Sequence, residues 1–323
     1  MLENTPVRFR LINCFYYFYG DMSIIVENIT KLYKTQKALN NVSFNVNENE
    51  IVGFLGPNGA GKSTMMKIIT CYIPPTDGKV KVCGFDIHDQ SLEVRKHIGY
   101  LPEHNPLYLD MYVKEFLIFV GGLYKIQNIE KRVKEMIDLT GLQIEQNKKI
   151  GALSKGYRQR VGLAQAMIHD PKVLIMDEPT TGLDPNQLEE IRGLIKKLGK
   201  EKTVMLSTHI MQEVEAVCDR VIIINHGEIV ANDSTQNLKQ QKTNQIIQVE
   251  FDGAIEVKLL EKIVGVQQVK KLEGNSYRII ASDEKDIRKD VFNIAVQNNI
   301  GVLTLNKEEQ KMEDVFKELT KKQ

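Results

Sequence analysis

The sequence offers little that would tie the chain to a special compartment or to a charged partner. Four cysteines, at positions 14, 71, 83 and 218, fit neither a metal-ligand spacing nor a disulfide framework. The net charge is +1, so composition indicates no overall attraction to nucleic acid or anionic lipid. No apolar run approaches the roughly 18 residues that a membrane span needs. These absences favour a reduced, cytosolic protein with no nucleic-acid partner.

What is present is typical of a globular chain. Apolar residues make up 42% and charged residues 26% of 323 residues, enough for a substantial core and roughly two domains. Residues 1–21 carry two arginines and a short aromatic patch but no small-residue cleavage site, so they make a poor signal peptide. A clean strand pattern begins at Met22. We therefore expect Met22 to be the true start and residues 1–21 to be an extra segment, untranslated or disordered.

The stretch GFLGPNGAGKSTMMKIIT, residues 53–70, carries a phosphate-binding pattern between a predicted buried strand and a predicted helix. The pattern G-x-x-x-x-G-K-[ST] is met by Gly56, Gly59, Gly61, Lys62 and Ser63. Glycines let successive N–H groups curl around phosphate oxygens. Lys62 would reach the β- and γ-phosphates, Ser63 would offer its hydroxyl to Mg²⁺, and Thr64 would support the α-phosphate side. The plain alternative, a glycine-rich turn with a stray lysine, leaves the flanking strand and helix unexplained.

A second element, KVLIMDEPTTGLD, places two carboxylates at the end of a buried strand. Ligands of open α/β sheets bind at the carboxyl ends of strands. Asp177 suits the Mg²⁺ shell, and Glu178 suits orienting or deprotonating an attacking water. Two acids in a solvated loop would be an equal alternative if the phosphate loop did not precede them. A third predicted strand, TVMLSTH, ends at His209, which is either a satisfied core histidine or a contact to the γ-phosphate.

The stretch LSKGYRQR, residues 153–160, reads as a helix start with Ser154 as its N-cap. A helix N-terminus favours a phosphate, so the chain holds a second candidate phosphate site. The ordered set of motifs, at 56–63, 153–157, 173–179, 181–184 and 207–209, resembles that of ATP-binding cassette (ABC) ATPases over residues 24–238. The resemblance implies an α/β P-loop NTPase: a RecA-like core with an N-terminal antiparallel β subdomain and a helical subdomain.

The resemblance also implies site residues for ATP and Mg²⁺. Tyr33 matches the aromatic that stacks on adenine, the alternative being an exposed strand residue. Glu103 falls where the family usually has a glutamine that senses Mg²⁺ and water. Glutamate keeps an acceptor oxygen but adds a negative charge, so the family's exact contact is not carried over to Glu103. The implied Mg²⁺ ligands are Ser63, Asp177 and Glu103. The further nucleotide contacts are Asn58 in the phosphate loop and Asp184 in the TGLD loop.

In this family two cassettes dimerise head-to-tail, and each ATP lies between the phosphate loop of one chain and the signature helix of the other. Ser154 and Gly156 would therefore face the γ-phosphate held by a partner, either a second copy or a paralogous ATPase. The usual LSGGQ reads LSKGY here, so Lys155 and Tyr157 cannot be assigned the family's contacts. Lys155 would add a positive charge, the favourable sign next to a triphosphate.

The helical region after Glu103 would receive a helix from a separate transmembrane permease. Its apolar stripe is expected to be mostly core, with a few members exposed as a docking groove; the stripe comprises Leu109, Tyr112, Phe116, Leu117 and Phe119. More narrowly, residues 22–221 resemble the ATP-binding subunits of gliding-motility ABC transporters, the GldA type. The resemblance implies a protein held peripherally on the inner face of the cell membrane.

Beyond residue 238 the character of the sequence changes. Residues 238–245 are polar and linker-like, and the patterns that follow predict strand, helix, two strands, helix and strand. This βαββαβ order predicts a small ferredoxin-like α+β domain over 239–323, after an ATPase domain over 22–238. KMEDVFKELTKK adds a predicted last helix.

Two other functions stay open. A soluble ABC ATPase acting on DNA or ribosomes is disfavoured because the sequence has no long heptad insertion, no second cassette and no basic patch. A small-molecule P-loop kinase would leave the signature and TGLD motifs unexplained. The leading hypothesis is the ATPase of an ABC-2-type exporter or motility complex, in which ATP closes the dimer and hydrolysis reopens it.

Overall fold

The fold was analysed in a computed structural model, and the residues it describes are 22–240, 244–282 and 286–308, together with Glu313, Phe316 and Thr320. The expected extra segment, 1–21, and most of the expected last helix, 311–322, lie outside these residues. The chain divides into two compact units between Ser234 and Thr235, rather than after residue 238. Each unit is described by itself.

The first unit is built on a six-stranded sheet in the order β10-β9-β3-β8-β7-β6. Its strands are β3 (Ile51–Leu55), β6 (Ile98–Leu101), β7 (Val173–Asp177), β8 (Thr203–Thr208), β9 (Arg220–Asn225) and β10 (Glu228–Ser234). All neighbours pair in parallel except β10, which runs antiparallel to β9. β3, β7 and β8 are buried throughout, which explains their continuous apolar runs. Their carboxyl ends meet at one edge, where the predicted motifs follow.

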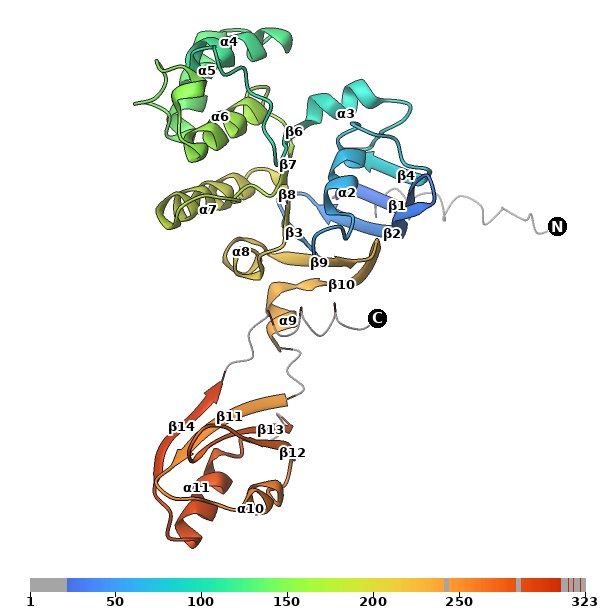
Figure 1. The fold of residues 1–323 in the computed structure, drawn as a ribbon. Helices are drawn as coiled ribbons and strands as arrows, with labels where there is room; N and C mark the ends of the chain where they lie inside the picture. Colours follow the sequence, from blue (N-terminus) through green and yellow to red (C-terminus); the bar gives the residue numbers. More distant parts are fainter. Residues whose placement is uncertain are drawn as a thin grey trace, which may run out of the picture. The chain divides into compact units, whose positions relative to one another are not determined.

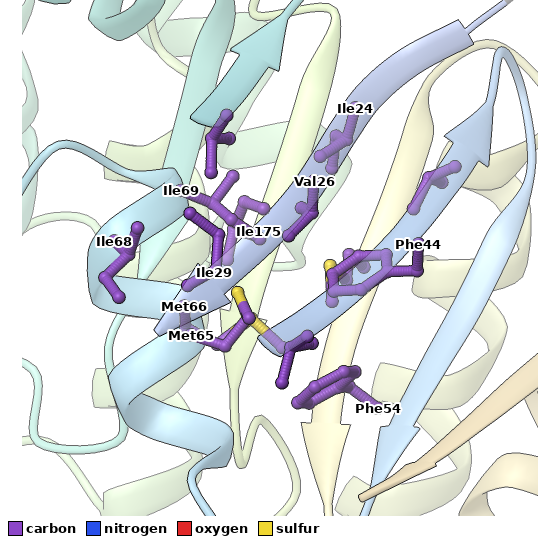
Figure 2. Close-up of a cluster of buried hydrophobic side chains, with 14 of the residues drawn as sticks. Ile24, Val26, Ile29, Phe44, Phe54, Met65, Met66, Ile68, Ile69 and Ile175 are labelled. Carbon is purple, nitrogen blue, oxygen red and sulfur yellow. The ribbon is translucent and has the colours of Figure 1, made fainter. Parts of the chain in front are cut away.

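A second, antiparallel sheet has the order β2-β1-β4-β5. Its strands are β1 (Met22–Tyr33), β2 (Gln36–Asn47), β4 (Asp77–Val82) and β5 (Phe85–Asp86). Helix α2 (Lys62–Ile69) lies between this sheet and the parallel one, while α7 (Pro185–Gly199) and α8 (Met211–Val217) lie on the other face of the parallel sheet (Figure 1). Figure 2 shows the shared core, where Met65, Met66 and Ile69 of α2 meet Ile29 and Ile175. The antiparallel sheet thus fixes α2, and with it the phosphate loop.

The helical region contains α4 (Val113–Leu123), α5 (Ile129–Thr140) and α6 (Lys155–Met167), after the short α3 (Ser91–His97). The expectation that most of the 109–119 stripe is core is wrong. Phe116 and Leu117 are buried, but Leu109, Tyr112 and Phe119 are 49%, 47% and 43% exposed. Of the exposed three, Leu109 and Tyr112 precede α4 and Phe119 lies within it. Among the described residues, no helix has both the length and the apolarity that crossing a bilayer requires.

The second unit begins with α9 (Thr235–Gln240) and continues as a four-stranded sheet with two helices. Its elements are β11 (Asn244–Phe251), α10 (Val257–Glu261), β12 (Val266–Lys271), β13 (Ser276–Ser282), α11 (Arg288–Gln297) and β14 (Val302–Glu308). The order is β-α-β-β-α-β, and the sheet, β12-β13-β11-β14, is antiparallel throughout. The 238–245 segment is less linker-like than expected, because its start belongs to α9 and its end to β11.

Candidate nucleotide-binding and catalytic site

The phosphate loop joins β3 to α2 and needs glycine for steric reasons. A Cβ on Gly56 would lie 2.4 Å from the carbonyl oxygen of Ile224 on β9. Gly61, the residue before α2, has φ 109, and a Cβ there would lie 2.6 Å from the carbonyl oxygen of Ala38. Side chains would push this loop away from β9 and β2. The loop thus lies close to β9 and β2. Helix α2 begins directly after it, at Lys62, and the free N–H groups of its first turn lie at the loop.

Lys62 is held inside the loop. Its side chain is 7% exposed, and Nζ donates to the carbonyl oxygen of Gly56 at 2.8 Å and of Pro57 at 3.3 Å. Nζ also lies 3.7 Å from Oε1 of Glu178. Burial lowers the pKa of Lys62, and the carboxylates of Glu178 and Asp177 oppose this lowering. The arrangement aims one cation at the place where the motif predicts phosphate oxygens.

Asp177 forms the end of β7 and gathers two hydroxyls. Ser63 Oγ donates to Asp177 Oδ1 at 3.2 Å, and Ser207 Oγ of β8 donates to the same oxygen. Asp177 is 2% exposed. A hydroxyl from the motif of the phosphate loop and a carboxylate from the end of β7 therefore lie side by side, and these are the two residues that the sequence analysis named as Mg²⁺ ligands.

Glu178 and His209 face each other across the ends of β7 and β8. His209 Nδ1 lies 3.0 Å from Oε1 and 2.9 Å from Oε2 of Glu178. Because an ionised carboxylate only accepts, the Nδ1 atom carries the hydrogen. Thr181 Oγ1 donates to Oε2 at 3.3 Å. The Glu178 side chain is 9% exposed and that of His209 is 44% exposed, so Glu178 lies inside the site and His209 at its mouth.

A cavity of about 610 Å³ opens over the phosphate loop. The predicted site residues that line it are Tyr33, Asn58, Gly59, Gly61, Lys62, Ser63, Thr64, Glu103, Glu178 and His209. Glu103 also lines a second cavity together with Ser63 and Asp177. The first cavity therefore joins β1, the phosphate loop and the ends of β7 and β8 in one space.

Thr181 of the TGLD motif lines this cavity, but the predicted contacts Ser154, Gly156 and Asp184 do not. Ser154 caps α6, since its Oγ accepts from the N–H of Tyr157 at 3.4 Å, which confirms the predicted N-cap. Asp184 caps α7 by accepting from the N–H of Gln187 at 2.9 Å. A Cβ on Gly156 would lie 2.4 Å from Oε1 of Gln187. Gly156 therefore lies beside Gln187, the residue whose N–H donates to Asp184.

Sequence reasoning missed several contributors. Thr181 and Ser207 hold the two acidic residues, and Gln36 and Ala38 of β2 line the cavity. Both hydroxyl residues lie inside motifs that were recognised, TGLD and STH, so their position next to an acidic residue was the available signal. For Gln36 and Ala38 the sequence carried no signal, because only the fold brings β2 to the loop.

The parallel sheet, the loop after β3 and the acidic end of β7 define a P-loop nucleotide-binding protein. The ABC transporter family model matches residues 39–181. The uncharacterized ABC transporter ATP-binding protein YxlF of Bacillus subtilis is 40% identical over 240 residues, which cover 73% of this chain and 79% of YxlF. The bacitracin transport ATP-binding protein BcrA of Bacillus licheniformis is 32% identical over 306 residues, 92% of this chain and 98% of BcrA.

Solved structures agree with these relatives. The dimeric post-hydrolysis structure of the ATP-binding cassette MJ0796, bound to ADP and Pi, superposes with a TM-score of 0.61 at 31% identity, covering 65% of this chain and 98% of that one. The chain therefore belongs to the ATP-binding subunits of ABC transporters, and it is an ATPase.

Proposed function

We propose that the cavity over the phosphate loop binds ATP and that Glu178 and His209 act on its hydrolysis. The observation that carries this is the convergence of Lys62, Glu178 and His209 on one space. Lys62 exchanges its bonds to loop carbonyls for phosphate oxygens. Glu178 orients the attacking water and takes its proton, while His209 holds the carboxylate and contacts the γ-phosphate. Tyr33, which is 46% exposed at the rim, stacks on adenine.

The same site fits Mg²⁺. Ser63 and Asp177 present a hydroxyl and a carboxylate oxygen 3.2 Å apart, and Glu103 lines the adjoining cavity. Mg²⁺ prefers oxygen ligands and is commonly held by one or two carboxylates together with substrate phosphates. Within the described residues, no group of three or more histidine, cysteine, aspartate or glutamate side chains is arranged to hold a metal ion. When bound, the ion would neutralise charge on the phosphate oxygens.

We propose further that two cassettes pair head-to-tail, either two copies or this chain with a paralogue. Ser154 and Gly156 lie away from the cavity of their own chain, which supports a role in the partner's site. The free N–H groups at the start of α6 would then face the γ-phosphate bound by the partner. The MJ0796 cassette, which was solved as a dimer, supports the pairing.

The transmembrane permease is proposed to dock on the region around α4, holding the chain on the cytoplasmic face of the membrane. Val120 and Tyr124, near the end of α4, line a cavity of about 170 Å³ with Tyr100 of β6, Gln165 and His169. In this described region, Tyr100 Oη, Gln165 Oε1 and His169 Nδ1 are buried and have no hydrogen-bond partner. Buried polar atoms call for a partner. A polar side chain of a permease segment would satisfy them.

Co-expression with candidate permeases tests this assignment against an ATPase acting on DNA or ribosomes. The chain should co-purify with one defined permease, and that permease should change its ATPase rate in proteoliposomes. Sedimentation with ribosomes or nucleoprotein, at the same salt, with no response to any permease would contradict the proposal.

The narrower assignment is an exporter or gliding-motility transporter of the GldA type, supported by the resemblance of residues 22–221 and by BcrA, a bacitracin transport protein. The first compact unit, which ends at Ser234, would be the ATPase domain, and the second, from Thr235, would be a ferredoxin-like accessory domain; its βαββαβ order and antiparallel sheet support this. Deleting the gene should stop gliding in the host. A Glu178→Gln allele, expressed at wild-type level, should fail to restore it, whereas gliding by the deletion strain would contradict the assignment.

A further inference from the structure

A buried carboxylate behind the site has no part in the roles proposed so far. Glu213 lies in the first turn of α8 and is 2% exposed. One of its oxygens accepts a hydrogen bond from Thr180 Oγ1, and the other accepts from Thr208 Oγ1 at 2.6 Å. Burying a carboxylate is costly unless both oxygens are hydrogen-bonded, and here both are.

The two threonines belong to different segments of the catalytic edge. Thr180 lies two residues after Glu178, in the turn that leaves β7. Thr208 is the last residue of β8 and directly precedes His209, and its Oγ1 also accepts from the N–H of Ile210 at 3.1 Å. One side chain on α8 therefore ties together the two backbone segments that carry the facing residues of the site.

The turn after Glu178 and the end of β8 both need a contact that fixes their positions. Glu178 has φ 51, a left-handed conformation that non-glycine residues seldom adopt, and such strain persists only where the surroundings fix it. The His209 side chain is 44% exposed, so packing alone does not orient it. A displacement of about 1 Å at a reacting group can cost about 10²-fold in rate.

We propose that Glu213 is a positioning residue for ATP hydrolysis. It clamps the turn after Glu178 to the end of β8 and thereby sets the spacing between the Glu178 carboxylate and the His209 ring. The clamp touches neither the phosphate loop nor the cavity over it. It rests on the roles proposed for Glu178 and His209.

The direct test is Glu213→Gln in the full-length chain. Glutamine has the same size but only one acceptor oxygen, so one of the two threonine hydroxyls loses its acceptor. We expect kcat to fall about 10- to 100-fold, the range seen when supporting hydrogen bonds of a site are removed. The Kd for ATP should stay within about twofold, because the phosphate loop is untouched. The acid limb of the kcat–pH profile should keep its midpoint, since Glu213 contacts no reacting atom.

The matched control is Glu215→Gln, the same change two residues along α8, which should leave kcat, Kd and melting temperature as in the wild type. Thr208→Val and Thr208→Ser form a second pair. Valine keeps the volume and removes the hydroxyl, so it should lower kcat, whereas serine should restore it. This pair keeps the test valid even if Glu213→Gln fails to fold.

Two outcomes would overturn the inference: an unchanged kcat in Glu213→Gln, or parallel losses of kcat, ATP affinity and melting temperature in all these variants. Glu178→Gln, measured alongside, separates the inference from its premise. If Glu178→Gln abolishes turnover and Glu213→Gln does not, only the clamp is wrong. If Glu178→Gln retains turnover, the proposed catalytic roles are themselves wrong.

Discussion

At the scale of single residues, the position of Glu178 shows how the neighbouring strand sets a side chain. Its backbone N–H donates to both the carbonyl oxygen and the hydroxyl of Ser207, at 3.1 and 3.2 Å. These bonds hold φ at 51, a conformation that costs about 1–3 kcal/mol. The strained turn places the carboxylate beside His209 instead of continuing β7. The left-handed backbone conformation of Glu178 therefore places its carboxylate in the cavity over the phosphate loop.

Substitutions at Lys62 and at Glu178 distinguish the roles proposed for the two residues. Lys62→Ala should weaken ATP binding, because it removes the point charge aimed at the β- and γ-phosphates. Glu178→Gln should bind ATP but turn over about 10²–10⁴-fold more slowly, the usual contribution of a positioned acid or base. Equilibrium binding and single-turnover hydrolysis measure the two separately. Lys79→Ala, on the exposed side of β4, is the charge-matched control, and an equal loss of binding in both site variants would contradict these roles.

The residues proposed to contact a phosphate or water come from the sequence, because each sits in a motif whose spacing points to its chemistry. Their supports could not. Ser207 meets Asp177 through the parallel register of β7 and β8, in which these two residues are paired. Glu213 meets Thr180 across a separation of 33 residues. Such contacts depend on strand order, which the sequence does not state.

At the scale of elements, one ion-paired arginine, Arg220, connects the two sheets of the first unit. Glu50, directly before β3, receives Nε and Nη2 of Arg220 on β9 at 2.6 and 2.9 Å. Nη2 also donates to the backbone carbonyl oxygen of Asn45 on β2, and Nη1 donates to Oδ1 of Asn232 on β10. The guanidinium therefore binds four segments together, in the bidentate geometry that makes such pairs strong.

This pair makes stability depend on pH. Burial alone would raise the pKa of Glu50, but the bonds and charge of Arg220 and the N–H of Asn47 hold it below the usual value of 4.5. A lowered folded-state pKa contributes stability above the unfolded value, and this is lost as pH falls through the folded value. Glu50→Gln should therefore lower the free energy of unfolding by about 1.5–3 kcal/mol at pH 7.

Urea denaturation at pH 7 and at pH 3.5 measures that difference, which should shrink at the lower pH, because below the ordinary pKa of 4.5 the unfolded wild-type chain takes up a proton at Glu50 more readily than the folded chain. Glu48→Gln removes an exposed acid from the same turn and should change stability little at either pH. A Glu50→Gln deficit that stays constant over this range would mean that the Arg220 pair does not account for it.

The type of an element could be predicted from hydrophobic periodicity, but which of its residues are buried could not. Buried apolar runs predicted β3, β7 and β8, and the cap at Ser154 predicted α6. The stripe before and within α4 was misjudged because apolar spacing marks a face without saying what covers it. Leu109 and Tyr112 precede the helix, so helical spacing did not apply to them.

At the scale of the whole molecule, a complete site is predicted to need two chains. Ser154→Arg should leave ATP binding nearly intact but stop hydrolysis, because it obstructs the partner's site. Mixing Ser154→Arg with Lys62→Ala chains gives a heterodimer with one composite site of an intact phosphate loop and an intact signature. That mixture should regain partial ATPase activity. No recovery, at concentrations where analytical ultracentrifugation shows dimers, would contradict the head-to-tail arrangement.

The proposed attachment to the membrane through a permease can be tested at Tyr112. Tyr112 is 47% exposed and occupies the N-cap position of α4, where aspartate is a favoured residue. Tyr112→Asp should therefore leave the melting temperature unchanged while placing a charge on the proposed docking surface. We expect the wild-type chain to sediment with membranes only when its permease is present, and Tyr112→Asp to be released from them. Val230→Asp, on β10 at the opposite edge of the sheet, should stay bound. A wild-type chain that is folded yet never sediments with permease-containing membranes would contradict the transporter assignment itself.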